Sequence, residues 1–317
     1  MKKHNEVFSM LRAAEQEGRC VYGRTRAQRQ ALLRRRRSGE LISPYCNLYA
    51  DRGYWNDLNN EQRSLHTIRA LAKLHPQWVF TGLSAACLYG VEHSYTLHDG
   101  AVYIVSRSGA SRKDEFHLNR IYMNQIVAYE REGILLTSPA RMLLDCSGFE
   151  FPLALALFDS AMRKSLTTVD EVRSLAAQSI CPEQLVNKLL QYVDPRSENG
   201  GESMMRGCIV DRNFAIPLLQ VEFDNPGNPA MPYRVDFCWK LADGRIIVAE
   251  FDGMEKYADT SNRYRASLQA KMEYERRREQ DLKEQGITVV VHIVFEDLTS
   301  PWRLESKLIR AGVPKNR

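Results

Sequence analysis

The chain has 317 residues, of which 44% are hydrophobic and 26% are charged, and its formal net charge at pH 7 is +5. This length is too great for a typical single core, so we expect two or three domains. The composition is that of an ordinary soluble globular protein, and no stretch approaches the roughly 20 apolar residues of a membrane helix. These features exclude a membrane-spanning role and a low-complexity chain.

Seven cysteines are spread along the chain, and none forms a Cys-x-x-Cys pair. An odd number at this spacing is typical of reduced packing cysteines and not of a disulfide framework or a zinc ribbon. The first residues include two lysines but no apolar run after them, unlike a secretory signal. We therefore expect a cytoplasmic protein.

The positive charge is concentrated at the N-terminus. Residues 1–40 contain eleven Lys or Arg and four Glu, a net of +7, so the remaining 277 residues sum to −2. A local basic excess of this kind indicates a discrete anionic partner near the N-terminus.

The first region, residues 1–58, reads as two helices followed by a hairpin. Apolar residues recur at helix spacing within residues 7–14. A second helix is expected to begin at Thr25, a suitable N-cap, and to end at Gly39. The Tyr-, Ile- and Leu-rich stretch 40–55 predicts a short hairpin. This order is that of a winged helix-turn-helix domain, whose basic helix can enter the major groove of double-stranded DNA.

The second of these helices contains four consecutive arginines, which cover every side of a helix, so at least one must lie toward the core. The run is open to two interpretations: a nucleic-acid contact, favoured by the local charge excess, or a solvated helix face. The candidate DNA-contacting residues are Arg24, Arg26, Arg29, Arg34, Arg35, Arg36 and Arg37.

The second region, residues 61–195, is predicted to be an α+β domain. Helices are expected at 62–75, 81–90 and between 138 and 175, and strands at 100–106, 115–123 and 133–138. Its histidines are His66, His75, His93, His98 and His117. None of them stands at ligand spacing from a second His or Cys, so we expect no catalytic constellation in this region.

The third region, residues 196–317, follows a polar, glycine-containing joint. Its expected order is helix, three strands, a long helix, a buried strand and a last helix. Such an order forms a mixed sheet flanked by helices, so the chain as a whole is predicted to be a multidomain α/β protein.

Three carboxylates stand out in two strand-like segments of this region. If Ala242-Asp243-Gly244 form a three-residue loop, Asp236 falls opposite Glu250, and Asp252 lies on the same face. A two-residue Asp-Gly loop would instead set Asp236 and Glu250 on opposite faces. The cluster therefore depends on the length of the loop.

Carboxylates this close repel one another unless they are protonated or bridged by a cation. Asp and Glu oxygens suit Mg²⁺ or Mn²⁺, and such a cation can activate a water for attack on phosphorus. The alternative is a solvent-facing strand edge whose acids are incidental.

The segment YRVDFCWKLADGRIIVAEFDG resembles the core of the PD-(D/E)XK nuclease superfamily, in the branch related to very-short-patch-repair endonucleases. The resemblance implies a restriction-endonuclease-like fold in which Asp236, Glu250 and Asp252 bind the metal and act in catalysis. It also implies that Glu202, on an upstream helix, belongs to the site. Downstream, the matching positions are Glu275, Arg278, Glu279, Leu282 and Gly286.

The chain departs from this family in two ways. Branch members often carry a histidine about five residues after the second Asp, where this chain reads EKYAD, with Lys256 and Tyr257. The superfamily's lysine is Asp252 here, as is usual in this branch, so a positive group must come from elsewhere. Lys256 is the candidate that could stabilise charge on the phosphate, ahead of Lys271 and Arg278, although an exposed lysine is the simpler interpretation of Lys256. Without such a group the domain would bind DNA and not cut it.

Residues 1–175 resemble the AbiEi family of antitoxins from type IV toxin–antitoxin systems. The stretches RRRRSGELISPYCNLYA, TGLSAACLYG and GILLTSPARMLLDCS carry this resemblance in their order. It implies a bacterial DNA-binding regulator with a winged helix, linked to phage defence.

Three functions follow from these patterns. The first is a metal-dependent DNA endonuclease delivered to DNA by the winged helix, and the second is a non-catalytic regulator or antitoxin that keeps a nuclease-like scaffold. The third is a partner-binding protein whose central region docks a toxin. Converging carboxylates repel DNA unless a metal neutralises them, so their presence favours the endonuclease.

Overall fold

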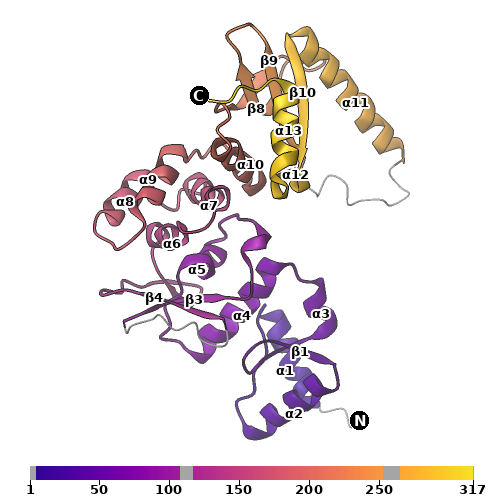
Figure 1. Ribbon diagram of the computed structural model, residues 1–317. Coiled ribbons are helices and arrows are strands. Elements are labelled where there is room, and N and C mark those ends of the chain that lie inside the picture. The colour runs from indigo at the N-terminus through magenta and orange to yellow at the C-terminus, as the bar shows by residue number, and fades with distance from the viewer. Residues whose placement is uncertain (1–4, 108–116, 253–264, 317) are drawn as a thin grey trace. The chain divides into compact units, whose positions relative to one another are not determined.

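The computed structural model describes residues 5–107, 117–252 and 265–316, and its fold is mixed α/β (Figure 1). The chain divides into two compact units. The first comprises Met1–Gly148 and Lys164–Leu190, and the second comprises Phe149–Arg163 and Gln191–Arg317. The second unit thus corresponds to the predicted third region with one added helix from the predicted central domain.

The first unit begins with two helices, a hairpin and a short third helix. These elements are α1 (Asn5–Gln16), α2 (Arg26–Arg37), β1 (Leu41–Tyr45), β2 (Leu48–Asp51) and α3 (Arg52–Asp57). Thr25 forms a capping box with Gln28 at the start of α2, and Gly39 follows the helix with a φ of +83°. The predicted limits of α2 are therefore confirmed, because both capping signals are local.

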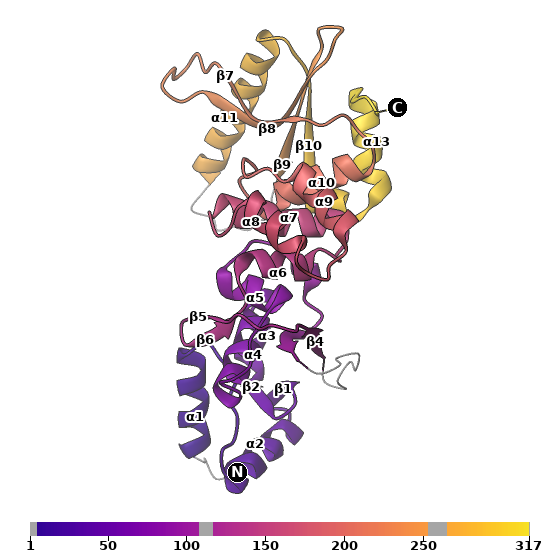
Figure 2. The ribbon, with the colours of Figure 1, turned by 90° about the vertical axis from the view of Figure 1, so that its left-hand side faces the viewer.

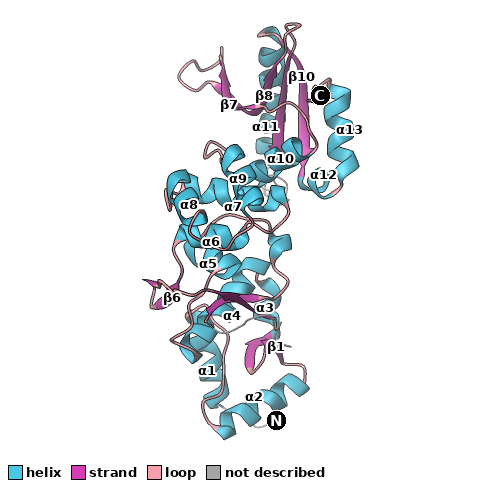
Figure 3. Ribbon diagram, turned by 60° about the vertical axis from the view of Figure 1, so that its left-hand side comes forward, coloured by secondary structure: helices cyan, strands magenta, loops and turns pink. Residues whose placement is uncertain are grey.

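The predicted hairpin is confirmed, but it is shorter than expected. β1 and β2 pair antiparallel from Leu41–Asp51 to Tyr45–Leu48. The chain then forms α3, because the Asp51 side chain accepts a hydrogen bond of 3.0 Å from the Tyr54 backbone N–H and so caps a helix. Figure 3 shows β1 beside α2, and the two elements are in contact.

The rest of the first unit packs helices around small sheets. Its elements are α4 (Asn60–Leu74), α5 (Gly82–Tyr89), the 3₁₀ helix η1 (Tyr95–Leu97), β3 (Val102–Ser106), β4 (Leu118–Tyr122), β5 (Tyr129–Arg131), β6 (Ile134–Leu136), α6 (Pro139–Cys146), α8 (Val169–Ala176) and α9 (Glu183–Tyr192). β3 and β4 are parallel, and β5 and β6 form an antiparallel hairpin. The fully buried Phe80 bridges to both β3 and β6 through its backbone and so joins the two sheets.

The second unit is built around one four-stranded sheet. Its elements are α7 (Phe151–Arg163), α10 (Gly200–Asp211), β7 (Leu218–Phe223), β8 (Tyr233–Lys240), β9 (Ile246–Asp252), α11 (Arg265–Glu284), β10 (Ile287–Val294), α12 (Phe295–Thr299) and α13 (Pro301–Ala311). The strand order is β10-β9-β8-β7, with β9 and β10 parallel and the other pairs antiparallel. The predicted order of helices and strands is confirmed, with α12 as a short addition. A parallel pair needs a crossover, and α11 provides it.

Helices cover both faces of this sheet, with α11 on one side of β8–β10 and α13 on the other (Figure 2). One hydrophobic core joins Phe237 and Ile247 of the sheet to α10, α12 and α13. A second core joins Val235 and Val248 to Leu282 of α11. Burial on both faces explains why β8, β9 and β10 read as nearly continuous apolar runs.

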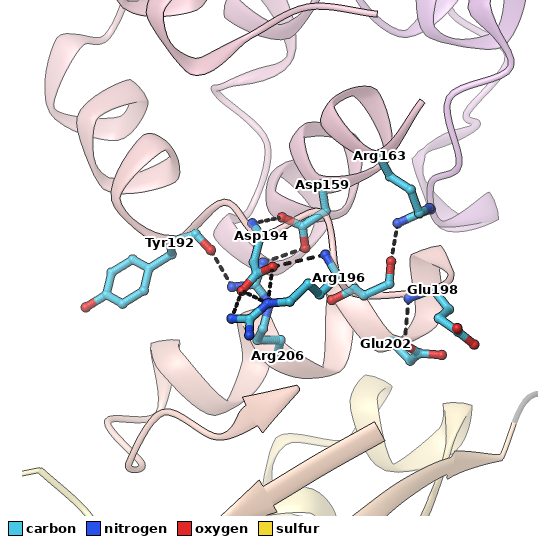
Figure 4. Close-up of polar contacts among 9 residues, drawn as sticks. Asp159, Arg163, Tyr192, Asp194, Arg196, Glu198, Glu202 and Arg206 are labelled. Carbon is cyan, nitrogen blue, oxygen red and sulfur yellow. Dashed lines mark hydrogen bonds and ion pairs between the residues drawn. The ribbon is translucent and has the colours of Figure 1, made fainter. Parts of the chain in front are cut away.

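The position of α10 is fixed by a buried ion pair and by a close helix contact. Arg206 of α10 pairs with Asp159 of α7 and also donates to the Tyr192 carbonyl (Figure 4). The side chain of Arg206 is 4% exposed and that of Asp159 is 0% exposed. A Cβ added to Gly207 would stand 2.5 Å from the Pro152 Cα, so the two helices meet at this glycine. These two contacts hold α10, which carries Glu202 in its first turn, against α7.

Candidate functional site

The β8–β9 hairpin closes through the three-residue loop 242–244. The Leu241 N–H donates to the Arg245 carbonyl at 2.9 Å, and Gly244 has a φ of +88°. The strands pair in the register that begins at Lys240–Ile246 and ends at Phe237–Ala249. Of the two loop lengths that the sequence leaves open, the structure has the three-residue one, and the pairing ends one residue short of Asp236 and Glu250.

Asp236 lies at an irregular point of β8, where the alternation of side chains between the two faces of the sheet is broken. Its Oδ2 accepts a hydrogen bond of 2.8 Å from the Phe251 N–H, and its Oδ1 is 3.5 Å from the Gln220 Nε2. Gln220, on β7, has a φ of +52°, a left-handed conformation that non-glycine residues rarely adopt. The side chains on either side of Asp236, Val235 and Phe237, enter different hydrophobic cores. Backbone distortion of this kind is concentrated at functional sites.

Glu202, in the first turn of α10, is coupled to Asp236 through Gln220. Its Oε2 accepts hydrogen bonds from the Glu198 N–H at 2.7 Å and from the Gln220 Nε2 at 3.0 Å. Only 4% of Glu202 is exposed. Burial, and then the negative charge of Asp236, raise the pKa of Glu202 to about 7, although the hydrogen-bond donors oppose the shift. A carboxyl group that titrates near neutral pH beside a second carboxylate is a feature of catalytic sites.

Glu250 forms an ion pair with α11. Its Oε1 lies 2.6 Å from the Arg278 Nη2, which also donates to the Arg234 carbonyl at 2.9 Å. The side chains of Glu250 and Arg278 are 10% and 14% exposed. Arg278, one of the lesser candidates for the positive group, is therefore the cation that the structure brings to Glu250.

Asp252 contacts a histidine that the sequence did not single out. Its Oδ2 lies 3.0 Å from the Nδ1 of His292 on β10, and the parallel register pairs His292 with Glu250. A polar histidine within the apolar run of β10 was the available signal. The sequence alone does not show which strand lies beside β10, so it does not place this histidine next to Asp252.

The first choice for the positive group, Lys256, lies outside the described residues, and so does the Lys271 side chain. Among the residues that are described, Asp236, Glu250 and Asp252 do not bring three ligand oxygens within 4.8 Å of one another. The acids from α10, β8 and β9 therefore gather at one end of the sheet without forming a compact metal-ligand set. We call Glu202, Asp236, Glu250 and Asp252 the carboxylate cluster.

The arginines of α2 and the β1–β2 hairpin form a groove of about 520 Å³ in the first unit. Arg26, Arg29 and Arg36 line it from the helix, at the spacing of a single helix face, and residues 43–47 line it from the hairpin. All three arginines are exposed. We call this groove the basic groove.

The other candidate arginines differ in their surroundings. Arg24, Arg34 and Arg37 are exposed, whereas Arg35 is buried. Arg35 pairs with Glu40 at 3.0 Å, and its guanidinium lies 4.7 Å from the centre of the Phe8 ring. The expectation that one arginine of the run faces the core is confirmed, and Arg35 is that residue.

Within the described parts of the chain, no helix has both the length and the apolar character needed to cross a membrane. No protein-family model, curated protein or solved structure matches the chain.

Proposed function

We propose that the protein is a metal-dependent DNA endonuclease whose basic groove holds double-stranded DNA. The observation that carries the proposal is the gathering of four acidic side chains from α10, β8 and β9 at one end of a single mixed sheet, with Arg278 and His292 beside them. Acids are costly to bury, and this end of the sheet holds them next to cationic groups and hydrogen-bond donors.

Asp236, Glu250 and Asp252 would supply the hard oxygen ligands that Mg²⁺ or Mn²⁺ prefers, once their side chains turn toward one cation. When bound there, the cation would lower the pKa of a water and neutralise charge that develops on the phosphate. Glu250 contacts Arg278 at 2.6 Å, so it would have to exchange this contact for the cation. The released Arg278 could then donate to a phosphate oxygen, which is a favoured partner of a guanidinium.

His292 is suited to accept a proton from the attacking water. The Asp252 carboxylate only accepts hydrogen bonds, so the Nδ1 that faces it at 3.0 Å carries the hydrogen. The Nε2 of a neutral His292 is then left with its lone pair, and the carboxylate stabilises the imidazolium that forms after proton transfer. Glu202, with a pKa of about 7, would buffer the charge at Asp236.

The basic groove supports the choice of DNA as the substrate. A helix face with three exposed arginines beside a hairpin can contact the phosphates of a duplex. The arginines supply charge-assisted hydrogen bonds that do not depend on sequence. The groove therefore supports binding, and the carboxylate cluster supports the chemistry.

A second candidate function is a non-catalytic DNA-binding regulator or antitoxin with a nuclease-like scaffold. The observation that favours it is the pairing of Glu250 with Arg278 and of Asp252 with His292. The Arg278 guanidinium offsets the charge of Glu250 without a metal, and His292 gives Asp252 a hydrogen-bond partner, which is what a scaffold needs. A cognate toxin as a partner stays a prediction.

Supercoiled plasmid incubated with the full chain separates the two functions. The endonuclease should convert it to nicked or linear DNA with Mg²⁺ or Mn²⁺ and not with EDTA. Asp236→Asn should abolish the conversion, whereas Glu222→Gln, which changes an exposed acid of the same sheet, should retain it. If the wild type binds DNA but never cuts it, the regulator is favoured. If Asp236→Asn cuts as fast as the wild type, the carboxylate cluster is not the active site.

A further inference from the structure

Three side chains with metal-ligating atoms meet in the first unit. Cys87 lies in the last turn of α5, His93 follows Gly90, where α5 ends with a φ of +67°, and His98 follows η1. The Sγ of Cys87 is 3.9 Å from the Nε2 of His93, which is 2.8 Å from the Nε2 of His98. Among the described residues, this is the only group of three His, Cys, Asp or Glu whose ligand atoms all lie within 4.8 Å of one another.

The outer nitrogen of each histidine is already engaged. The Nδ1 of His93 lies 2.6 Å from the Val91 carbonyl, which can only accept, so this nitrogen carries the hydrogen and the Nε2 presents a lone pair. The Nδ1 of His98 lies 2.9 Å from the Ser64 Oγ on α4. Hydrogen bonds of this kind to the second ring nitrogen orient histidines that bind metals.

The segment that carries the two histidines is held in place by α4. Asn60, at the start of α4, donates to the Tyr95 carbonyl at 3.4 Å, and Asn59 approaches the Tyr95 hydroxyl at 3.5 Å. Cys87 is buried with 4% exposure, while both histidines are half-buried. The site therefore combines one buried sulfur with two partly exposed imidazoles.

We propose that Cys87, His93 and His98 bind a Zn²⁺ ion, with water as the fourth ligand. One thiolate and two imidazoles are ligands that Zn²⁺ accepts in a tetrahedral arrangement. Zn–N and Zn–S bonds of ordinary length would place the two Nε2 atoms about 3.3 Å apart and the Sγ about 3.6 Å from each of them. In the structure the two Nε2 atoms are 2.8 Å apart, the Sγ is 3.9 Å from the Nε2 of His93, and all three ligand atoms lie within 4.8 Å, so small side-chain rotations would reach these values.

A hydrogen bond between the two histidines is the metal-free alternative. A hydrogen on the His98 Nε2 could be donated to the His93 Nε2, with the Ser64 hydroxyl donating to the His98 Nδ1. This arrangement satisfies both rings, but it gives no role to the Cys87 Sγ, which points to the same place. The two arrangements differ in the state of Cys87: it is a thiolate that has released its proton when a metal is bound, and a thiol when the site is empty.

Metal binding by the full chain decides between them. The purified protein should hold one Zn²⁺ in this unit, and Co²⁺ that replaces it should show the strong near-ultraviolet absorption of a thiolate ligand. Cys87→Ser should remove that absorption, and His98→Gln should lower the affinity for Zn²⁺ by at least about tenfold. The thiolate signal distinguishes this site from the carboxylate cluster of the second unit, which contains no sulfur.

Matched variants keep the test decisive. Cys46→Ser removes the exposed cysteine of the hairpin and His75→Gln removes a histidine that stacks on Trp78, and both should bind like the wild type. If circular dichroism shows that Cys87→Ser does not fold, His93→Gln and His98→Gln decide, since each should weaken the thiolate absorption. No Co²⁺–thiolate absorption in the wild type, or the same absorption in the three site variants as in the wild type, would overturn the proposal.

Discussion

The basic groove and the carboxylate cluster handle charge in opposite ways. In the groove, Arg26, Arg29 and Arg36 are exposed to solvent, and the charge is available to a partner. In the cluster, Glu202 and Glu250 are buried, and Glu250 is matched to Arg278 on another element. Charge that faces water costs the fold little, whereas charge inside the second unit persists only because a partner compensates it.

The difference shows that the role of a charged residue depends on local structure in the basic groove and on tertiary structure in the carboxylate cluster. The role of an arginine in α2 depends on its angular position around one helix. The partner of an acid in the sheet depends on the tertiary fold, because the paired residues Glu250 and Arg278 come from different elements. Substitutions around the carboxylate cluster should therefore mainly change stability or chemistry, whereas substitutions of exposed arginines in the basic groove should mainly change binding.

Arg206→Met should lower the free energy of unfolding by about 3–5 kcal/mol, because it leaves the Asp159 carboxylate buried without its partner. Urea unfolding followed by circular dichroism measures the change. The exposed Arg310→Met in the same unit should change stability by less than about 0.5 kcal/mol. Equal effects of the two substitutions would contradict the compensation that we assign to the buried pair.

Glu202 should make stability depend on pH. Its folded pKa of about 7 lies above its ordinary value of 4.5, so the folded state binds more protons between these values. The free energy of unfolding contributed by Glu202 should therefore fall as pH rises from 5 to 8, by about 3 kcal/mol at most. Glu202→Gln should remove this fall, while Glu222→Gln, at an exposed position, should keep it. Parallel pH profiles for all three proteins would argue against the shift.

Replacing Arg26, Arg29 and Arg36 together by Gln should weaken DNA binding in a salt-dependent way. Three lost phosphate contacts would reduce the slope of log K against log salt concentration by about 2.7. When the salt is raised from 50 to 200 mM, the wild type should therefore lose about 40-fold more affinity than the variant, or about 2 kcal/mol more. Fluorescence anisotropy with a duplex measures it. If the slope does not change, the groove does not contact phosphates.

Two adjacent arginines should separate fold from binding. Arg35→Gln should destabilise the first unit by about 1 kcal/mol, since it removes the contacts with Glu40 and Phe8, and should leave the salt slope unchanged. Arg36→Gln should leave stability unchanged and lower the slope by about 0.9. Thermal unfolding and anisotropy on the same samples compare them. A reversed pattern would mean that the helix phase has been misassigned.

The sequence predicted the elements that depend on local signals. The caps of α2 and the order of elements in the second unit follow from residues a few positions apart, whereas the sequence left the length of the loop at Gly244 open between two and three residues. The start of α3 was missed, because residues 52–55 were taken as part of the hairpin, whereas Asp51, the last residue of β2, caps a helix there.

Contacts between distant elements could not be predicted in the same way. The pairing of Asp252 with His292 and the left-handed conformation of Gln220 arise only when the strands are assembled. Cys87 and His93 were set aside because their spacing fits no ligand motif. They meet because α5 ends at Gly90 and the chain turns back, which the spacing alone does not reveal.

The most direct test of the account measures DNA binding and DNA cleavage on the same variants. Asp236→Asn should retain the affinity of the wild type for a duplex and lose at least about 100-fold in the rate of Mg²⁺-dependent cleavage, the scale of losing one catalytic group. The triple Arg26, Arg29 and Arg36 variant should bind weakly and still cleave at saturating protein concentration. A wild type that binds DNA and never cleaves it, or an Asp236→Asn variant that cleaves at the wild-type rate, would contradict the division of labour between the groove and the cluster.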